Sequence, residues 1–428
     1  MPLLAATPPE RSLPRQLIGR LPFFYGWIIL GCVCCAGFSR QGGAVATLSI
    51  FVEPMTRHFG WSRTAISGAV SLGGLLAALA SPLLGRLLDR QGARAVLGLA
   101  VLLTGAADLG LSLTSSLVMF YALFCVARMN FAGPFDLGIY GAVNNWFVTR
   151  RTMAISIATI AQMAGLVALP LIAEAMILRG GWRAGWLGVG AAVLAVGFIP
   201  NWLFMVRRPE DVGLVPDRAV LRTVQAAAAQ HPEPDFTRAQ ALRTPAFWLL
   251  SLFTLLAYPV QAGVSLHQAP FLIERGISPA IAASIVSAFS MMSGVSSLGF
   301  GFYPRRLPVH YALALVGLLL CGGTLAMLTV HSAVVGFLAA GTFGLGIGGL
   351  LTMLPLAWAD YFGRTSYGAI RGIALSVQVL AQAAGPLLSG LLRDWSGNYT
   401  LSLQCFGVLS GLSLLAALLA RPPAARHA

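Results

Sequence analysis

Two arginines lie inside apolar stretches of this 428-residue chain, and their chemistry narrows its function more than any other feature. Arg40 falls within the apolar run 25–51, and Arg128 falls within the run 116–142. A guanidinium keeps its proton at any accessible pH, so in apolar surroundings it needs a counter-anion or a water-filled cavity. Its planar fork also binds a carboxylate through two parallel hydrogen bonds. We therefore expect Arg40 and Arg128 to bind opposite ends of one small organic anion.

Acidic residues in the same kind of stretch offer another explanation. Asp108 and Asp136 could each neutralise one of the arginines as a structural ion pair. Asp136 follows Arg128 by eight residues, about 12 Å along a helix axis, and lies beyond the Gly133-Pro134 break, which argues against direct pairing of those two. Asp136, Asp108 and His267 are the candidates for proton coupling, although His267 could equally be an interfacial polar residue.

The elements that position these residues are apolar helices. Hydrophobic residues make up 57% of the chain and charged residues 10%, and the mean hydropathy is +0.79. A helix needs about 20 apolar residues to cross a bilayer. Twelve stretches meet this requirement: 25–51, 63–84, 95–114, 116–142, 152–178, 184–205, 246–270, 280–303, 310–330, 332–358, 370–392 and 399–420. We predict an all-α integral membrane fold with twelve transmembrane helices, and no cleavable signal precedes the first.

The arginines also predict the orientation of the chain in the membrane. All 28 basic residues are arginine, and the net charge is +14. Twenty of them fall in the two tails and in the even-numbered loops, whereas six fall on the opposite face. An excess of positive charge marks the cytoplasmic side. We expect a multi-pass protein of the inner (plasma) membrane with both termini in the cytoplasm and no nucleic-acid partner.

Cysteine and catalytic patterns point away from metal binding and catalysis. The six cysteines all fall within the apolar stretches, and no set of histidines or further cysteines accompanies them at ligand spacing. The chain also has no nucleophile with a matching base and acid, and no phosphate-binding loop. We expect no metal, no cofactor and no enzymatic activity.

The two halves of the chain are related by duplication. A constant offset of 216 positions aligns Ser62 with Ser278, Gly85 with Gly301, Gln162 with Gln378 and Pro170 with Pro386. Parallel repeats of this kind occur in secondary transporters, whose substrate site lies between the halves. The predicted segments are a cytoplasmic tail (1–22), a six-helix half (23–206), a cytoplasmic linker (207–245), a second six-helix half (246–420) and a second tail (421–428).

The loop after the second apolar stretch carries a motif, Gly85-Arg-Leu-Leu-Asp89-Arg90-Gln-Gly92-Ala-Arg94. It resembles the signature of the major facilitator superfamily, Gly-x-x-x-Asp-Arg-x-Gly-x-Arg. The resemblance implies that these residues form a tight cytoplasmic turn, which holds one conformation closed through the pairing of Asp89 with arginines at helix ends. The corresponding segment of the second half, which begins at Gly301, has no acid. We therefore expect a one-sided latch.

Further motifs narrow the resemblance to one branch of that superfamily. Phe59-Gly-Trp-Ser-Arg63, Asn145-Trp-Phe147 with Arg150-Arg151, Gly181-Trp-Arg183 and Asp360-Tyr-Phe-Gly363 resemble the monocarboxylate transporters and oxalate/formate exchangers. The well-known members pair a lysine in span 1 with an Asp-Arg couple in span 8, or use basic residues in spans 8 and 11. Span 1 here offers Arg40, and spans 8 and 11 are predicted to hold no such charge. The substrate and the coupling ion therefore stay open.

Span 7 is expected to line the transport path in this superfamily, together with spans 1, 4 and 10. Polar residues recur along it at steps of three and four, including Tyr258 and Gln261. With Gln378 of span 11, they are the expected neutral donors to the substrate. Helix packing through small polar residues is the alternative explanation of such stripes.

These observations predict a secondary active transporter that moves a small organic anion, a monocarboxylate, by alternating access. Protons are the candidate coupling partner, and the expected state is a monomer in the lipid bilayer. Two alternatives stay open. One is a facilitator or efflux carrier for a different small molecule, and the other is a membrane sensor or scaffold that does not transport.

Overall fold

The computed structural model describes residues 13–18, 20–217, 235–303 and 307–423, and within these ranges the regular elements are all helical. The first half contains, in order, the following elements: α1 (Leu13–Ile18), α2 (Gly26–Arg40), η1 (Gln41–Gly43), α3 (Val45–Phe59), α4 (Arg63–Leu111), α5 (Leu117–Ala132), α6 (Pro134–Trp146), α7 (Arg151–Val193), η2 (Leu194–Phe198), α8 (Ile199–Phe204) and η3 (Pro209–Val212). The second half contains these: α10 (Arg238–Leu242), α11 (Pro245–Glu274), α12 (Pro279–Gly301), α13 (Val309–Leu328), α14 (Ala333–Phe362), α15 (Tyr367–Ser396) and α16 (Thr400–Leu419).

The predicted twelve spans are confirmed once the two longest helical segments are divided. Ten segments of the described chain are long and apolar enough to cross a membrane, and two of these contain 47 and 54 residues. Each of the two turns back at a glycine with positive φ, Gly92 at 82° within α4 and Gly181 at 73° within α7. Glycine adopts this conformation without the penalty that a side chain imposes. The chain is therefore a multi-pass integral membrane protein of the all-α class.

Contacts between residues group the chain into two units, which are described separately. Unit 1 comprises Met1–Glu233 and Arg364–Ser376, and unit 2 comprises Pro234–Gly363 and Val377–Ala428. The first ten residues of α15 thus contact the N-terminal half, a grouping absent from the division predicted from the sequence. The predicted tails and linker fall partly outside the described residues, since 1–12, 218–234 and 424–428 are not described.

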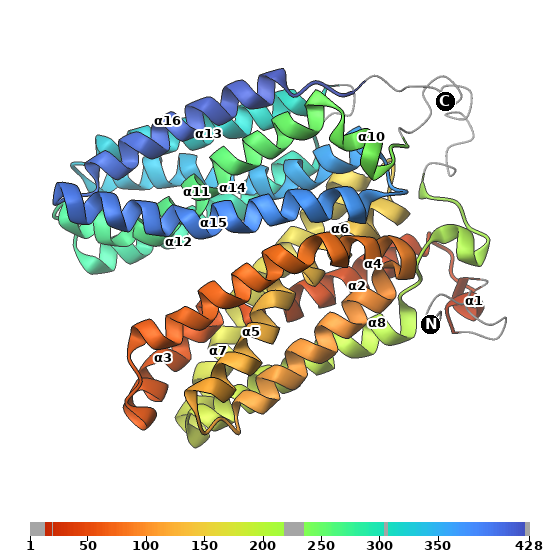
Figure 1. Cartoon of the computed structure of the whole chain (residues 1–428), viewed down its shortest axis with the longest axis horizontal. Helices are drawn as coiled ribbons and strands as arrows, with labels where there is room; N and C mark the ends of the chain where they lie inside the picture. Colours follow the sequence, from red (N-terminus) through yellow and green to blue (C-terminus); the bar gives the residue numbers. More distant parts are fainter. Residues whose placement is uncertain (1–12, 19, 218–234, 304–306, 424–428) are drawn as a thin grey trace. The chain divides into compact units, whose positions relative to one another are not determined.

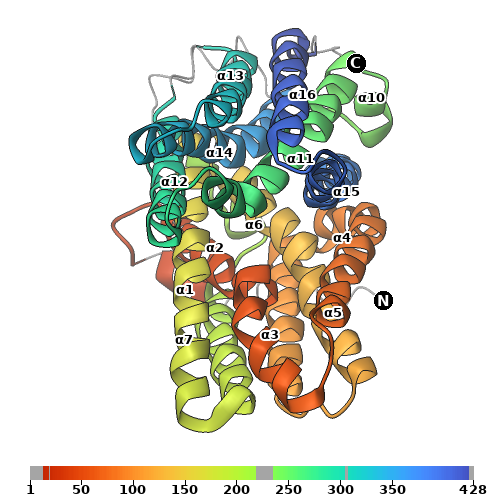
Figure 2. The ribbon, with the colours of Figure 1, turned by 90° about the vertical axis from the view of Figure 1, so that its left-hand side faces the viewer.

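In unit 1, α4 packs against α5, α6 and α7, and α2 packs against α7. Figures 1 and 2 both show α4 and α5 side by side. Two of the spans are interrupted inside this bundle. The first span stops at Arg40, passes through the 3-10 turn η1 and an extended Ala44, and resumes as α3. The fourth span is interrupted at Gly133, which separates α5 from α6.

These interruptions create helix ends at positions where charged groups occur. Arg40 lies in the last turn of α2, and Asp136 lies in the first turn of α6. A helix favours a cation near its C-terminus and an anion near its N-terminus, because the backbone dipoles leave partial charges there. Discontinuous helices of this kind supply ion and substrate sites in membrane transporters. The breaks therefore give both charges a favourable position inside an apolar bundle.

In unit 2, α13 packs against α14 and α16, α12 packs against α14, and α11 packs against α16 (Figure 1). A side chain on Gly344 or Gly348 of α14 would collide with the backbone of α12 at Phe289 or Ser293. These glycines therefore bring helices of the same unit close together.

Candidate functional site

The two predicted arginines share an aromatic partner in unit 1. The guanidinium carbon of Arg40 lies 4.6 Å from the centroid of the Phe131 ring, and that of Arg128 lies 4.5 Å from the same centroid. A cation close to an aromatic ring is attracted by the negative charge on the ring face. Phe131 was not among the predicted site residues. Its spacing of three from Arg128 on one helix was an available signal, since such residues share a face.

Arg40 is held mainly by neutral groups. Its Nε donates to the Phe131 carbonyl at 2.9 Å, and one terminal nitrogen donates to Gln162 Oε1 at 2.7 Å. The other terminal nitrogen lies 3.6 Å from Asp136 Oδ2. Gln162 also was missed as a site residue, although the duplication had aligned it with Gln378. Arg40 therefore has a fixed orientation and one long ionic contact.

Asp136 is shared between two arginines. Its Oδ1 lies 3.2 Å from a terminal nitrogen of Arg371, whose side chain is only 1% exposed. Arg371 was counted among the twenty arginines of the tails and even-numbered loops, and span 11 was predicted to hold no basic residue; both predictions are wrong. Arg371 is the fifth residue of α15 and is buried. Hydropathy alone put it at the edge of the span, whereas the ion pair with Asp136 of α6 makes it part of a buried ion cluster.

Arg128 has weaker contacts than Arg40. One of its terminal nitrogens donates to the Gly43 carbonyl at 3.5 Å, and its buried Nε has no hydrogen-bond partner. No carboxylate within the described ranges forms an ion pair with Arg128. The cluster therefore brings together three guanidinium charges, those of Arg40, Arg128 and Arg371, and one carboxylate charge. Excess positive charge remains for an anion to neutralise.

Asp108 lies apart from these ion pairs. The residue is fully buried in the second half of α4, and neither carboxyl oxygen has a hydrogen-bond partner. It packs directly against Gly42 of η1, where a Cβ would overlap Oδ2. The alternative explanation was that each arginine forms an ion pair with an aspartate. Arg40 does so with Asp136, whereas Arg128 forms no ion pair with an aspartate of the described residues.

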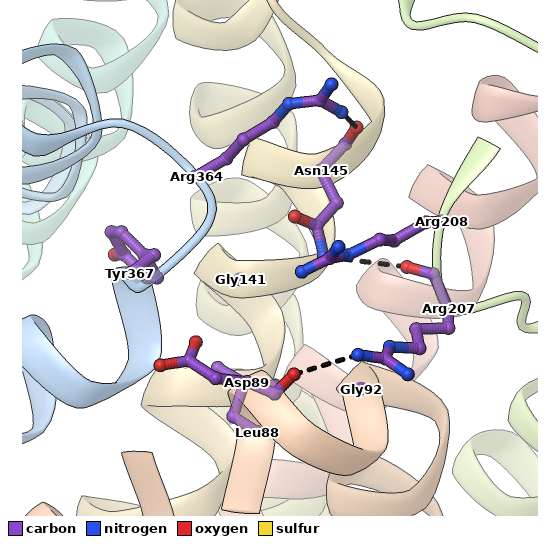
Figure 3. A pocket seen from close by; sticks show the side chains of 9 residues that line it. All are labelled: Leu88, Asp89, Gly92, Gly141, Asn145, Arg207, Arg208, Arg364 and Tyr367. Carbon is purple, nitrogen blue, oxygen red and sulfur yellow. Dashed lines mark hydrogen bonds between the residues drawn. The ribbon is translucent and has the colours of Figure 1, made fainter. Parts of the chain in front are cut away.

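The signature loop contributes a second cluster in unit 1. The carboxylate of Asp89 accepts hydrogen bonds from the backbone N–H groups of Gly368 at 2.8 Å and Ala369 at 2.7 Å. These groups belong to the first turn of α15, whose N–H groups have no partner within the helix. Arg207 donates to the backbone carbonyl of Asp89 at 2.9 Å, as Figure 3 shows. The Asp89 carboxylate thus caps a helix, whereas the resemblance implied pairing with arginines.

The other residues of the signature have distinct surroundings. Gly85 approaches the backbone of Gly368 so closely that a Cβ there would overlap its carbonyl. Arg94 donates to the Trp202 carbonyl at 2.9 Å, and Arg90 is exposed. Together with Gly92, whose positive φ turns the chain, these residues build the tight loop that the motif predicts. Asp89 and Gly92 also line a small polar pocket, which has room for about one water molecule (Figure 3).

The candidates in the second half belong to unit 2. Tyr258 and Gln378 are buried, and Gln261 Oε1 accepts a hydrogen bond from Gln382 Nε2 at 3.0 Å. The structure thus ties Gln261 to α15 through a neighbouring amide. Their role as neutral donors to a substrate stays a prediction.

His267 lies in a separate polar contact of unit 2. Its Nδ1 is 3.1 Å from the Tyr399 hydroxyl, and its Nε2 is 3.3 Å from the Pro386 carbonyl. Because a carbonyl can only accept, Nε2 carries the proton, and Nδ1 accepts from Tyr399 in the neutral ring. Both ring nitrogens therefore have partners, which makes His267 a structural link among α11, α15 and the loop before α16.

Comparison with known proteins relates the chain to one large group of transporters. Residues 29–386 match the family model described as Major Facilitator Superfamily. The chain is 26% identical to the membrane sensor protein UhpC of Salmonella typhimurium, over 79% of this chain and 79% of that protein. It is also 26% identical to human monocarboxylate transporter 11, over 94% of this chain and 85% of that protein.

Solved structures support the same fold. The proton:xylose symporter XylE aligns with a TM-score of 0.74 and 15% identity, covering 91% of this chain and 94% of that one. The transporter FucP, in an outward conformation, aligns with a TM-score of 0.68 and 13% identity, covering 93% and 100%. At this level of identity, the two structures support the fold and carry no information on substrate.

Proposed function

Because the chain belongs to the Major Facilitator Superfamily, we propose that it is a secondary transporter that carries a small organic anion, specifically a monocarboxylate, by alternating access. The family is one of membrane transporters and not of enzymes. The one observation that carries the anion class is the excess of positive charge in the Arg40 cluster, where three guanidinium groups accompany the single carboxylate of Asp136. Similarity to human monocarboxylate transporter 11 supports the substrate class.

The proposed site combines a rigid cation with an adaptable one. Arg40 is oriented by Gln162 and the Phe131 carbonyl, so its contact with Asp136 is the one a substrate carboxylate would replace. Arg128 makes one long hydrogen bond and keeps donor capacity, because its Nε has no partner. A carboxylate that reaches both arginines would gain charge-assisted hydrogen bonds, which are about twice as strong as neutral ones. Tyr258, Gln261 and Gln378 are the proposed neutral contacts.

We propose that the contacts of Asp89 with Gly368 and Ala369 control the change of conformation. The cap on Gly368 and Ala369 holds the start of α15 within unit 1, and Arg371, two residues further on, is held there by Asp136. Both contacts must open if α15 is to leave unit 1. When an anion displaces Asp136 from Arg40, the balance of charges around Arg371 changes as well. The substrate site and the latch would thus act on the same helix.

The orientation of the protein follows from its arginines. We propose that it lies in the plasma membrane with both termini in the cytoplasm, since nineteen of the 28 arginines fall on that side once Arg371 is placed within α15, and six fall on the other. The signature loop is then cytoplasmic. Protons are the proposed coupling ion, and the monomer is the proposed working unit.

A ligand screen on the purified protein tests the substrate class. Thermal unfolding is measured with a panel of carboxylates, and with sugars and amines of similar size as controls. A ligand that binds only the folded state stabilises it, by about 2.7 kcal/mol at one hundred times its Kd. We expect carboxylates to raise the unfolding temperature of the wild type and to leave Arg40→Gln and Arg128→Gln unchanged. Equal stabilisation of both variants by the same carboxylates would exclude the proposed site.

A membrane sensor is the second candidate, and the similarity to UhpC favours it. A sensor would bind the anion without moving it. Uptake of a radiolabelled carboxylate into proteoliposomes distinguishes the two, because a transporter accumulates label inside and a sensor only retains a stoichiometric amount.

A further inference from the structure

A buried carboxyl group in unit 1 has no role in the site described above. Asp108 is fully buried, and Thr104, one helical turn earlier on α4, is also fully buried. Both carboxyl oxygens and the Thr104 hydroxyl lack a hydrogen-bond partner. An ionised carboxylate without a partner costs many kcal/mol in a medium of low dielectric, and such a group becomes neutral by binding a proton. The surroundings of Asp108 therefore require the protonated acid.

Asp108 contacts the element that carries the anion site. Gly42, in the turn η1, packs against the Asp108 carboxyl on one helix, α4. The next residue, Gly43, packs against the Ala127 carbonyl on another helix, α5, and its own carbonyl accepts from Arg128. The interruption of the first span is thus wedged between Asp108 and the residues that position Arg128. Arg40 directly precedes this turn.

The space around Asp108 does not suit a metal cation. A bound cation needs several oxygen ligands converging on it at short distance. A side chain on Gly42 would meet the Asp108 carboxyl, Val193 and the methyl group of Thr104, so apolar groups and one carboxyl surround this point of η1. Within the described part of the chain, no group of three or more acidic, histidine or cysteine side chains forms a metal site. A proton, which needs no coordination shell, is the ligand that fits.

The neighbouring charges do not reach Asp108. On η1 and α2, Arg40 is directed to Asp136, and on α5, Arg128 is directed to Gly43 and Phe131. On α6, Asp136 is engaged with Arg40 and Arg371. From α7, the apolar Val193 lies beside the same point of Gly42 as Asp108 does. Neutrality of Asp108 is thus maintained by burial alone, and it ends when water gains access.

We propose that Asp108 is the proton-binding residue of the transport cycle, and that its proton is exchanged when the Gln41–Gly43 turn moves. This inference rests on the proposed function, to which it adds the residue that binds the coupling proton. While the turn is packed as in this structure, Asp108 holds the proton and lets Gly42 approach. When the turn moves and water enters, the acid dissociates into a carboxylate and a proton released to that water. Protonation then becomes a condition for the turn to close again.

Infrared spectroscopy tests the protonation state without any substrate. The purified protein in lipid is labelled with ¹³C at the aspartate carboxyl carbon and compared with Asp108→Asn. We expect the wild type at neutral pH to show the C=O stretch of a protonated carboxylic acid, shifted by the label and missing from the variant. Asparagine is neutral and of equal size, so the variant should fold. An identical band in the variant would overturn the proposal.

Two glycine variants provide a second, independent test of the contact between the turn and Asp108. Gly42→Ala places a methyl group against the Asp108 carboxyl, whereas Gly98→Ala, on the same helix as Asp108, meets open space. We expect the acid band to shift or vanish in Gly42→Ala and to be unchanged in the Gly98→Ala control. A band that is unaffected by Gly42→Ala would contradict the contact between the turn and the acid.

Transport assays separate this inference from the proposed function. Proteoliposomes are loaded with lactate, pyruvate or acetate as probes, and two rates are measured with ¹⁴C label. We expect Asp108→Asn to keep exchange of internal for external anion, which moves no net proton, and to lose accumulation driven by a proton gradient. Accumulation equal to the wild type would overturn the role of Asp108. If the wild type exchanges none of the probes, the proposed function fails, and the infrared result still decides the protonation state.

Discussion

Replacement of Asp136 by asparagine removes the only carboxylate in the cluster of three arginines, and its cost can be worked out from the contacts. Arg371 is 1% exposed and lies 3.2 Å from Asp136, so it would be left as a buried cation without its acid. Breaking a buried pair in this way costs about 3–5 kcal/mol. Arg40 is 12% exposed, lies farther away at 3.6 Å and keeps Gln162 and the Phe131 carbonyl. Most of the cost should therefore come from Arg371.

A double-mutant cycle separates the two contributions. The free energy of unfolding in mixed micelles is compared for Asp136→Asn alone and combined with Arg371→Gln or with Arg40→Gln. We expect Arg371→Gln to recover most of the lost stability and Arg40→Gln to recover little. The control is Asp394→Asn, because Asp394 is 77% exposed and its ion pair with Arg393 should contribute at most about 1 kcal/mol. The reasoning is refuted if Asp136→Asn is no more destabilising than this control, or if the recovery follows Arg40.

Two further changes test the latch and the aromatic partner. Asp89→Asn leaves one acceptor oxygen for two backbone N–H groups and removes the charge that strengthens both hydrogen bonds, each worth about 1.5–3 kcal/mol. We expect faster hydrogen exchange at Gly368 and Ala369, with the amides of α13 unchanged, and equal protection in both proteins would contradict the cap. Phe131→Leu removes a ring that both arginines contact, at about 0.5–2 kcal/mol for each cation. We expect the thermal stabilisation by a carboxylate to weaken, and a change at Phe120, whose ring contacts other aromatics, to leave it unaffected.

The architecture was accessible from the sequence because the bilayer imposes simple requirements on it. A chain that crosses hydrocarbon must form apolar helices of about 20 residues, and this length can be recognised without knowledge of packing. The turns at Gly92 and Gly181 likewise follow from local conformation. Arg40 and Asp136 could be singled out because a charge in such a helix is costly and therefore conspicuous.

The partners of these charges were decided by tertiary structure. Arg371 was assigned to a loop because it lies at the end of an apolar stretch, and only the close contact of α15 with α4, at Gly372 and Ser376, brings it beside Asp136. The interruption after Arg40 was hidden within a continuous apolar run, although Gly42 and Gly43 permit it. Phe131 and Gln162 carry no charge, and the spacing of Phe131 from Arg128 and the alignment of Gln162 with Gln378 did not by themselves show that either residue contacts Arg40.

The sequence by itself therefore determined the twelve helices, their glycine turns and the presence of cations inside them, because these depend on local composition and on the solvent that surrounds each stretch. The tertiary structure alone decided which charge meets which acid and which acid stays unpaired. Residues 40, 136 and 371 are far apart along the chain, and their distances depend on how the helices pack. Hydropathy measures a stretch of chain, whereas an ion pair is a relation between separate stretches.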